Sequence, residues 1–327
     1  MNFGDIVGQS ALTANLQGQL RSGRIVHAYL FTGEAGAGKR TLASICARAL
    51  VCEGDAKHRP CDECGPCRRA LSGNHPDIQT VEPGYASGVR GDKRPKSISV
   101  DDVRALSEFL SRRPFEAERN VALIPHAQLM TPQAQNALLK TLETPPGQSV
   151  LILTCDNLRA LLPTIISRCQ VVHMQPLDEG LVREYLLGRG VPSERAHLLA
   201  AISGGSIGRA LDMDGNADYW NVRTAVLDAL AELEDRTRVA SVTARLRDMR
   251  DSADWVLDTF ELYARDLMLD GEAAPLNIDR RAQIAVQSRR LNGLNMLGGV
   301  MRARERLRSN VGWASVLDMI CFDALEV

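Results

Sequence analysis

A glycine-rich loop at residues 33–39 limits the fold of this chain more strictly than any other feature. It reads G-E-A-G-A-G-K, follows an apolar β-prone run at residues 25–31, and precedes apolar residues at helical spacing from Leu42 to Leu50. A glycine-rich loop that ends in lysine and lies between a strand and a helix is typical of a phosphate-binding P-loop. The backbone N–H groups and the lysine of such a loop surround phosphate oxygens. The sequence therefore predicts a parallel α/β domain of phosphate-binding ancestry.

The side chains that an active P-loop ATPase needs for magnesium and water are missing from this sequence. The position after Lys39 should hold Ser or Thr as a Mg²⁺ ligand, but it holds Arg40, whose guanidinium is always protonated and cannot ligate a cation. The apolar stretch 121–124 resembles a second catalytic strand, yet it ends in Pro125-His126 instead of Asp-Glu. His126 is either a surrogate base or a loop histidine, and the loop interpretation is favoured. We therefore expect no ATP hydrolysis by this chain.

The chain divides into an α/β part followed by an all-α part. Residues 1–176 alternate apolar strands with helical patterns, which is typical of a parallel sheet. Beyond Pro176 we find only helical patterns, so a small helical domain at 177–215 and a larger helical bundle at 216–327 are expected. The strands are predicted at residues 25–31, 78–81, 121–124, 150–154 and 171–173, with helices at 101–112 and 133–143.

Charge and targeting signals narrow the class of protein. The 39 Lys and Arg residues nearly balance the 40 Asp and Glu residues, which excludes a histone-like mode of DNA binding. The stretch 84–97 is rich in Gly, Lys, Arg and Pro, but a solvated loop is favoured there over a DNA contact. The pair Arg68-Arg69 is likewise interpreted as a solvated face. Because the sequence shows neither a signal peptide nor a membrane-spanning stretch, we expect a cytoplasmic location and no membrane partner.

Four cysteines are crowded together at Cys52, Cys61, Cys64 and Cys67. In a cytoplasmic protein this crowding indicates tetrahedral zinc, and a site closed by four thiolates is structural rather than catalytic. The alternative is four reduced cysteines without metal, which the polar surroundings disfavour. The other cysteines lie in apolar contexts and are predicted to belong to the core: Cys46, Cys155, Cys169 and Cys321.

Several further motifs follow one another in a specific order. They are residues 7–9 (V-G-Q), 27–31 (H-A-Y-L-F), 135–143 (Q-N-A-L-L-K-T-L-E), 167–169 (S-R-C) and 204–210 (G-G-S-I-G-R-A). Together with the P-loop and the four-cysteine insertion, this order resembles the delta-prime subunits of bacterial DNA polymerase III clamp loaders, a family of the AAA+ superfamily. The similarity covers nearly the whole chain and is least specific in the last helical region.

The resemblance implies an AAA+ domain at 1–176 with a zinc insertion at about 52–67, a helical lid at 177–215 and an oligomerisation collar at 216–327. It implies that Arg168 acts in trans, as an arginine finger in the ATP site of a neighbouring subunit. A degenerate nucleotide site, for which binding of ATP or ADP stays open, would comprise Val7, Gly33, Gly36, Gly38, Lys39, Thr41 and Arg209.

The partners implied by the resemblance are the gamma or tau subunits and the delta subunit in a heteropentamer, the sliding clamp, and primer-template DNA. The implied function is to help open the clamp and load it on primed DNA during replication. Two alternatives remain from the residues themselves. An active motor ATPase of the same loader is disfavoured by Arg40 and Pro125-His126, and a zinc-dependent nucleic-acid-binding module is disfavoured by the nearly neutral charge.

Overall fold

A parallel sheet of five strands organises the first of two units into which the chain divides, Met1–Leu181. The computed structural model describes residues 2–88, 95–269, 274–309 and 311–326. The strands lie in the order β2-β3-β4-β1-β5, and every neighbouring pair is parallel. Each predicted strand is present, with the bounds β1 Ala28–Thr32, β2 Ile78–Thr80, β3 Val121–Ile124, β4 Val150–Cys155 and β5 Gln170–His173.

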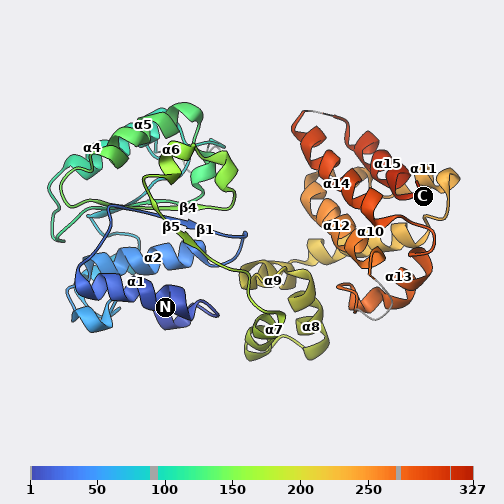
Figure 1. Cartoon of the computed structure of the whole chain (residues 1–327), viewed down its shortest axis with the longest axis horizontal. Helices are drawn as coiled ribbons and strands as arrows, with labels where there is room; N and C mark the ends of the chain where they lie inside the picture. The colour runs from blue at the N-terminus through green and yellow to red at the C-terminus, as the bar shows by residue number, and fades with distance from the viewer. Residues whose placement is uncertain (1, 89–94, 270–273, 310, 327) are drawn as a thin grey trace. The chain divides into compact units, whose positions relative to one another are not determined.

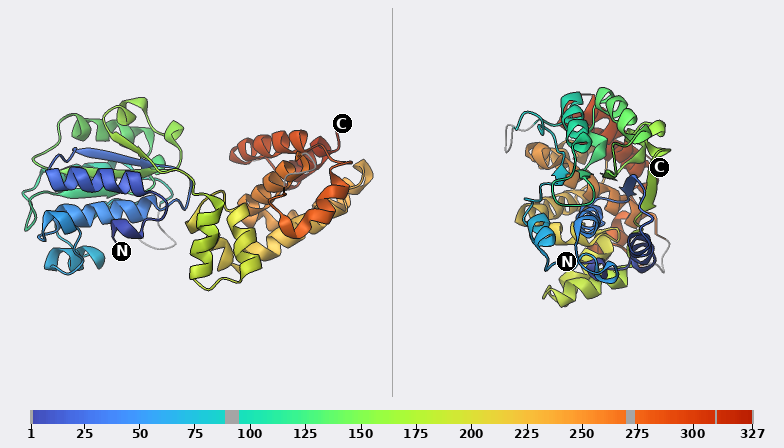
Figure 2. Two further views of the ribbon diagram at one scale, coloured as in Figure 1. Left: turned by 60° about the horizontal axis from the view of Figure 1, so that its bottom comes forward. Right: turned by 90° about the vertical axis from the view of Figure 1, so that its left-hand side faces the viewer.

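Helices cover both faces of this sheet (Figure 1). Along β1, Ala28 and Leu30 belong to a core shared with α4, α5 and α6, whereas Tyr29 and Phe31 belong to a core shared with α1 and α2. Alternate residues of a strand point to opposite faces, so a strand buried on both sides reads as one continuous apolar run. Figure 2 shows the same layers from two further directions. The helices are α1 Ser10–Ser22, α2 Lys39–Val51, α3 Gly65–Leu71, α4 Val100–Ser111, α5 Pro132–Glu143 and α6 Pro163–Ile166.

The second unit, Val182–Val327, contains helices and no strand among its described residues. Its main core lies between α10, α12, α14 and α15 and includes Phe260 and Tyr263. The buried helix face predicted from Val222 to Leu233 packs into this core. Helix α7 begins shortly before the unit, and the bounds are α7 Glu179–Gly188, α8 Ser193–Ile202, α9 Ile207–Asp214, α10 Ala217–Ala231, α11 Val239–Ala244, α12 Ala253–Leu267, α13 Arg281–Gln287, α14 Gly293–Arg308 and α15 Trp313–Ala324.

The predicted fold class, an α/β part followed by an all-α part with a P-loop on a parallel sheet, is confirmed. The further division of the helical region at residue 215 stays a prediction. Residues 89–94, which form the middle of the predicted solvated loop at 84–97, lie outside the described residues. Among the predicted core cysteines, Cys46, Cys155 and Cys321 are buried and Cys169 is half-buried.

Candidate nucleotide site and cysteine cluster

The P-loop connects the end of β1 to the start of α2 at the carboxyl edge of the sheet. Gly33, Gly36 and Gly38 all have positive φ angles, of 148°, 75° and 89°. A Cβ atom on Gly33 would lie 2.6 Å from the carbonyl oxygen of Met174, so the loop and the segment after β5 are in close contact. Helix α2 begins at Lys39 with Gly38 as its N-cap. The loop thus has the backbone form that directs N–H groups toward an anion.

The ammonium group of Lys39 is fully engaged by oxygen atoms of this chain. Its Nζ atom donates to the backbone oxygens of Gly33 at 2.7 Å and Glu34 at 2.5 Å. It also lies 2.6 Å from Oδ1 of Asp156, and its side chain is only 6% exposed. Because an ammonium has three donors, these three oxygens use its whole hydrogen-bonding capacity.

The carboxylate of Asp156, which follows β4, is held from a second side. Nε2 of Gln128 donates to its Oδ2 atom at 2.8 Å, and Nδ1 of His126 lies 3.5 Å from the same oxygen. Burial alone would raise the pKa of Asp156, but the hydrogen bond and charge of Lys39 outweigh burial and lower this pKa below 3.8. His126 itself is half exposed, with a φ of 54°, and its backbone N–H donates to Thr154. The carboxylate therefore stays charged at neutral pH.

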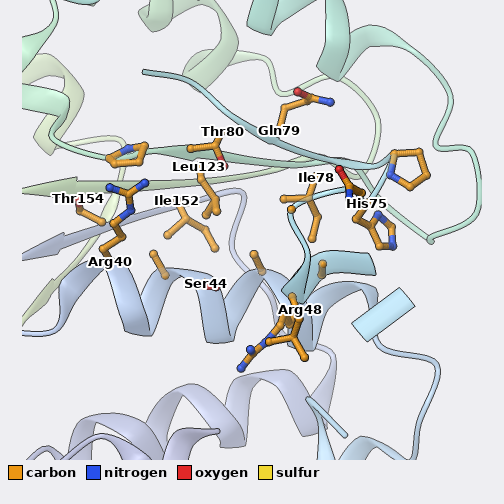
Figure 3. Close-up of a pocket in the computed structure, with 18 of the residues that line it drawn as sticks. Arg40, Ser44, Arg48, His75, Ile78, Gln79, Thr80, Leu123, Ile152 and Thr154 are labelled. Atoms are coloured by element: carbon orange, nitrogen blue, oxygen red, sulfur yellow. The ribbon is translucent and has the colours of Figure 1, made fainter. Parts of the chain in front are cut away.

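Arg40, in the first turn of α2, pairs with a carboxylate that follows β2. Its Nη2 atom lies 2.8 Å from Oε1 of Glu82, and 67% of its side chain is exposed. Arg40 borders a cavity of about 520 Å³ between α2 and the strands β2, β3 and β4. Figure 3 shows Arg40 and Thr154 at one end of this cavity and His75 at the other. The guanidinium is thus held by a protein carboxylate.

The remaining predicted nucleotide-site residues belong to three different segments of the chain. Thr41 is half-buried in the first turn of α2. Val7 is half-buried next to Gly8, and a Cβ atom on Gly8 would collide with Leu177 at 2.3 Å. Arg209 belongs to the second unit, where its Nη2 atom lies 2.7 Å from Oδ2 of Asp258 in α12. The predicted roles of Val7, Thr41 and Arg209 toward a nucleotide stay predictions.

Arg168 lies between α6 and β5, on the side of the sheet covered by α5. Its Nη2 atom is 2.8 Å from Oε1 of Glu143, the last residue of α5, and its Nη1 atom donates to the backbone oxygen of Thr164 at 3.0 Å. The side chain of Arg168 is 35% exposed, and that of Glu143 is 51% exposed. An ion pair this accessible to water contributes little to stability, so the guanidinium can exchange Glu143 for another anion at low cost.

The four predicted cysteine ligands come together after α2 and at the start of α3. Their Sγ atoms all lie within 4.8 Å of one another, and those of Cys52 and Cys61 are 3.6 Å apart. That distance is far longer than a disulfide bond of about 2.05 Å. It is close to the sulfur separation of about 3.8 Å that a tetrahedral zinc ion imposes with bonds of about 2.3 Å. The donor set and its spacing therefore fit a tetrahedral metal ion.

Backbone N–H groups stabilise negative charge on the cluster. Those of Gly54 and Cys61 point to Sγ of Cys52 at 3.3 and 3.5 Å, and that of Cys64 points to Sγ of Cys61 at 3.4 Å. Hydrogen bonds from the backbone of Cys64 and Glu63 lower the pKa of Cys61 to about 7. Burial has the opposite effect on Cys52 and Cys67 and raises the pKa of both thiols. N–H groups directed at sulfur are suited to thiolate ligands.

The pair Arg68-Arg69 beside the cluster divides into two different environments. Arg69 forms a bidentate contact with Glu116, with distances of 3.0 Å from Nε and 2.6 Å from Nη2. Arg68 is exposed. On the other side of the cluster, Arg48 of α2 is buried and lies 3.5 Å from the carboxylate of Asp62. Ion pairs thus attach the cluster to the sheet domain at two points.

Reasoning from the sequence missed the carboxylates that pair with the site's cations. Asp156 is the partner of Lys39, Glu82 of Arg40 and Glu143 of Arg168. A signal for Asp156 was present, because a polar residue directly after a buried central strand lies at the carboxyl edge of a parallel sheet, where such sites form. Glu82 carried the same signal, because it directly follows the predicted strand at residues 78–81.

Comparison with known proteins places these features in a family. The family described as DNA polymerase III, delta subunit, matches residues 8–178. The chain is 31% identical to the DNA polymerase III subunit delta' of Bacillus subtilis, over 93% of this chain and 92% of that protein. It is 40% identical to the DNA polymerase III subunit delta' of Pseudomonas aeruginosa, over 61% of this chain and 58% of that protein.

A solved structure supports the fold. A DNA polymerase III gamma subunit-related protein from Thermotoga maritima matches with a TM-score of 0.50 and 15% identity, over 94% of this chain and 98% of that chain. At this identity the likeness concerns the fold alone. Among the residues that the structure describes, we find no helix with the length and apolar character needed to span a membrane.

Proposed function

The chain belongs to the delta-prime family of DNA polymerase III subunits, and we propose on this basis that it serves as the delta-prime subunit of the clamp loader. In that role it helps to open the sliding clamp and to place it on primer-template DNA in the cytoplasm. Its proposed partners are the gamma or tau subunits and the delta subunit. We assign residues 177–215 to the lid and residues 216–327 to the collar through which these subunits assemble.

We infer that this subunit does not hydrolyse ATP. The inference is supported by Arg40, which stands where a Mg²⁺ ligand is required and pairs with Glu82 at 2.8 Å. It is also supported by Pro125-His126, which offers no carboxylate to position water. Charge neutralisation by a metal ion and orientation of the nucleophile are thus both missing. The competing hypothesis, an active motor subunit, requires ATP turnover by the pure chain that Lys39→Ala abolishes.

We propose that Arg168 acts as an arginine finger in the ATP site of a neighbouring motor subunit. The observation that carries this role is its position: Arg168 is 35% exposed between α6 and β5, where it forms an accessible ion pair with Glu143 and one hydrogen bond to the backbone of Thr164. A guanidinium can stabilise charge on a γ-phosphate, and fingers of this kind contribute roughly 10³–10⁵ to the rate in GTPases. The effect on a loader with several ATP sites is expected to be smaller.

A reconstituted loader containing Arg168→Ala tests this role. We expect normal assembly, a reduced clamp- and DNA-stimulated ATPase rate and reduced clamp loading. Arg168→Lys should not restore activity, because an ammonium lacks the planar fork of a guanidinium. Arg104→Ala is the matched control, since Arg104 also forms an accessible ion pair, with Asp101 at 3.0 Å. Stimulated ATPase at the level of this control would refute the assignment to Arg168.

We propose that Cys52, Cys61, Cys64 and Cys67 hold one structural zinc ion. The support is the donor set with its 4.8 Å limit on sulfur separations, and the N–H groups directed at Cys52 and Cys61. All four positions around the ion would be filled by protein ligands, so it would fix the 52–67 insertion and leave no position for catalysis. The alternative role as a zinc-dependent DNA-binding module requires DNA binding by the isolated chain that chelation removes.

A further inference from the structure

The geometry of the P-loop points to a role for a residue that no motif includes. We propose that Asp156 is an internal ligand of the P-loop: its carboxylate takes the place of a nucleotide phosphate at Lys39 and so excludes nucleotides from the loop. The inference deepens the proposed absence of hydrolysis, because it concerns the same loop. It is nevertheless separable from that proposal, since a chain can bind a nucleotide without hydrolysing it.

Lys39 is saturated by oxygen atoms of this chain. Its three donors are directed at the backbone oxygens of Gly33 and Glu34 and at Oδ1 of Asp156. In a working P-loop the lysine contacts the outer phosphates of the nucleotide. Here the only anionic partner of Lys39 among the described residues is the carboxylate of Asp156, at 2.6 Å. A phosphate could reach the ammonium only by displacing that carboxylate.

Asp156 is fixed in this position from its other side. The side-chain amide of Gln128 contacts the residue twice: Nε2 donates to Oδ2 at 2.8 Å, and Oε1 accepts from the backbone N–H of Asp156 at 3.4 Å. The register of the sheet adds a constraint, because Thr32 pairs with Cys155. The carboxylate is therefore held beside the loop before any ligand arrives, and a displaced carboxylate would lose both Lys39 and Gln128.

Electrostatic repulsion also disfavours a phosphate at the loop. A cavity of about 320 Å³ lies beside the loop, and Asp156 and Glu34 are the acidic groups that line it. The basic groups in its lining are Arg159 and His173. With Lys39 neutralised by Asp156, a polyphosphate at the loop would meet a carboxylate a few ångströms away. Repulsion between like charges at such separations weakens binding by one or more orders of magnitude.

Binding measurements on the full chain test this role. Isothermal titration calorimetry with ADP and with inorganic tripolyphosphate, each with and without Mg²⁺, should show no binding to the unmodified chain at about millimolar ligand. Asp156→Asn removes the charge but keeps the size of the side chain, and it should bring both ligands into the measurable range, an affinity gain of at least about tenfold. Gln128→Ala, which loosens the carboxylate without removing it, should give a smaller gain.

Two controls make the result specific. Glu82→Gln changes the net charge by the same amount and frees Arg40 rather than Lys39, so it should give no gain. Lys39→Ala added to Asp156→Asn should abolish the gained binding. Circular dichroism monitors folding, and Asp156→Ser replaces Asp156→Asn if the latter does not fold.

Three results would overturn the inference. They are ADP binding by the unmodified chain as tight as by Asp156→Asn, no binding by a folded Asp156→Asn, and gained binding that survives Lys39→Ala. If the unmodified chain binds ADP this tightly but shows no ATP turnover, the inference about Asp156 fails and the proposed non-hydrolysing function still stands. ATP turnover by the unmodified chain would instead contradict the proposed function.

Discussion

The contact between Lys39 and Asp156 should contribute measurably to the stability of the sheet domain. The side chain of Lys39 is only 6% exposed. Lys39→Met removes this buried charge and the contacts of Nζ with Gly33, Glu34 and Asp156. Removing one partner of a buried ion pair costs about 3–5 kcal/mol, because the other charge is left uncompensated. Asp156 is 29% exposed and keeps its hydrogen bond to Gln128, so water and the amide offset part of that cost. We therefore expect a loss of about 1–3 kcal/mol in the free energy of unfolding.

Urea and thermal unfolding of the full chain measure this loss. For a unit of 150–250 residues, each kcal/mol shifts the midpoint of thermal unfolding by about 2–4 °C, so the sheet domain should unfold about 2–12 °C earlier. A double-mutant cycle with Asp156→Leu isolates the pair, and the double variant should regain most of the stability because no charge is left unpaired. Arg104→Ala should change stability by less than about 0.5 kcal/mol. Lys39→Met as stable as the unmodified chain would refute the reasoning.

Three further perturbations have expected outcomes. Since Lys39 lowers the pKa of Asp156 below 3.8, the stability from this carboxylate is present above that pH and lost as pH falls through the folded-state pKa. The difference in unfolding free energy between the unmodified chain and Asp156→Asn should thus shrink as pH falls below about 4; a difference that stays constant or grows between about pH 5 and pH 3 would contradict this. Elemental analysis should find one zinc per chain, and Cys67→Ser should lose the metal while the sheet domain stays folded. Gly33→Ala should destabilise the chain by about 1–3 kcal/mol in urea unfolding, because its Cβ would meet the oxygen of Met174 at 2.6 Å.

Apolar runs determined the sheet well because each central strand is buried on both faces. The strand at Val121–Ile124 has the predicted bounds, since Asn120 and Pro125 interrupt the apolar run at both ends. The first strand begins at Ala28, later than the predicted residue 25. The backbone N–H of Ile25 bonds to Gly23, and that of Val26 bonds to the hydroxyl of Tyr29, so these apolar residues cover the core without pairing in the sheet.

The candidate site was predictable only where its residues are adjacent in the sequence. The P-loop and the cysteine cluster are both local, so residue type and spacing were enough to find them. The contact between Lys39 and Asp156 depends instead on β4 lying next to β1, with Thr32 paired to Cys155. Nothing in the local sequence specifies that order of strands. The same reason applies to Arg168 and Glu143, which come from segments separated by β4.

The paired carboxylates also account for an apparent inconsistency in the sequence, which keeps a P-loop lysine but lacks the metal ligand. If Lys39 served only hydrolysis, it would have no role once Arg40 had replaced the hydroxyl that binds Mg²⁺. In the structure Lys39 has a different role, because it joins the loop after β1 to the residue after β4 through contacts of 2.7 and 2.6 Å to Gly33 and Asp156. That cross-link joins the carboxyl ends of the paired strands β1 and β4. For the proposed action of Arg168 on a neighbour's ATP site, such a cross-link would let the position of Arg168 depend on assembly and not on a nucleotide bound to this chain.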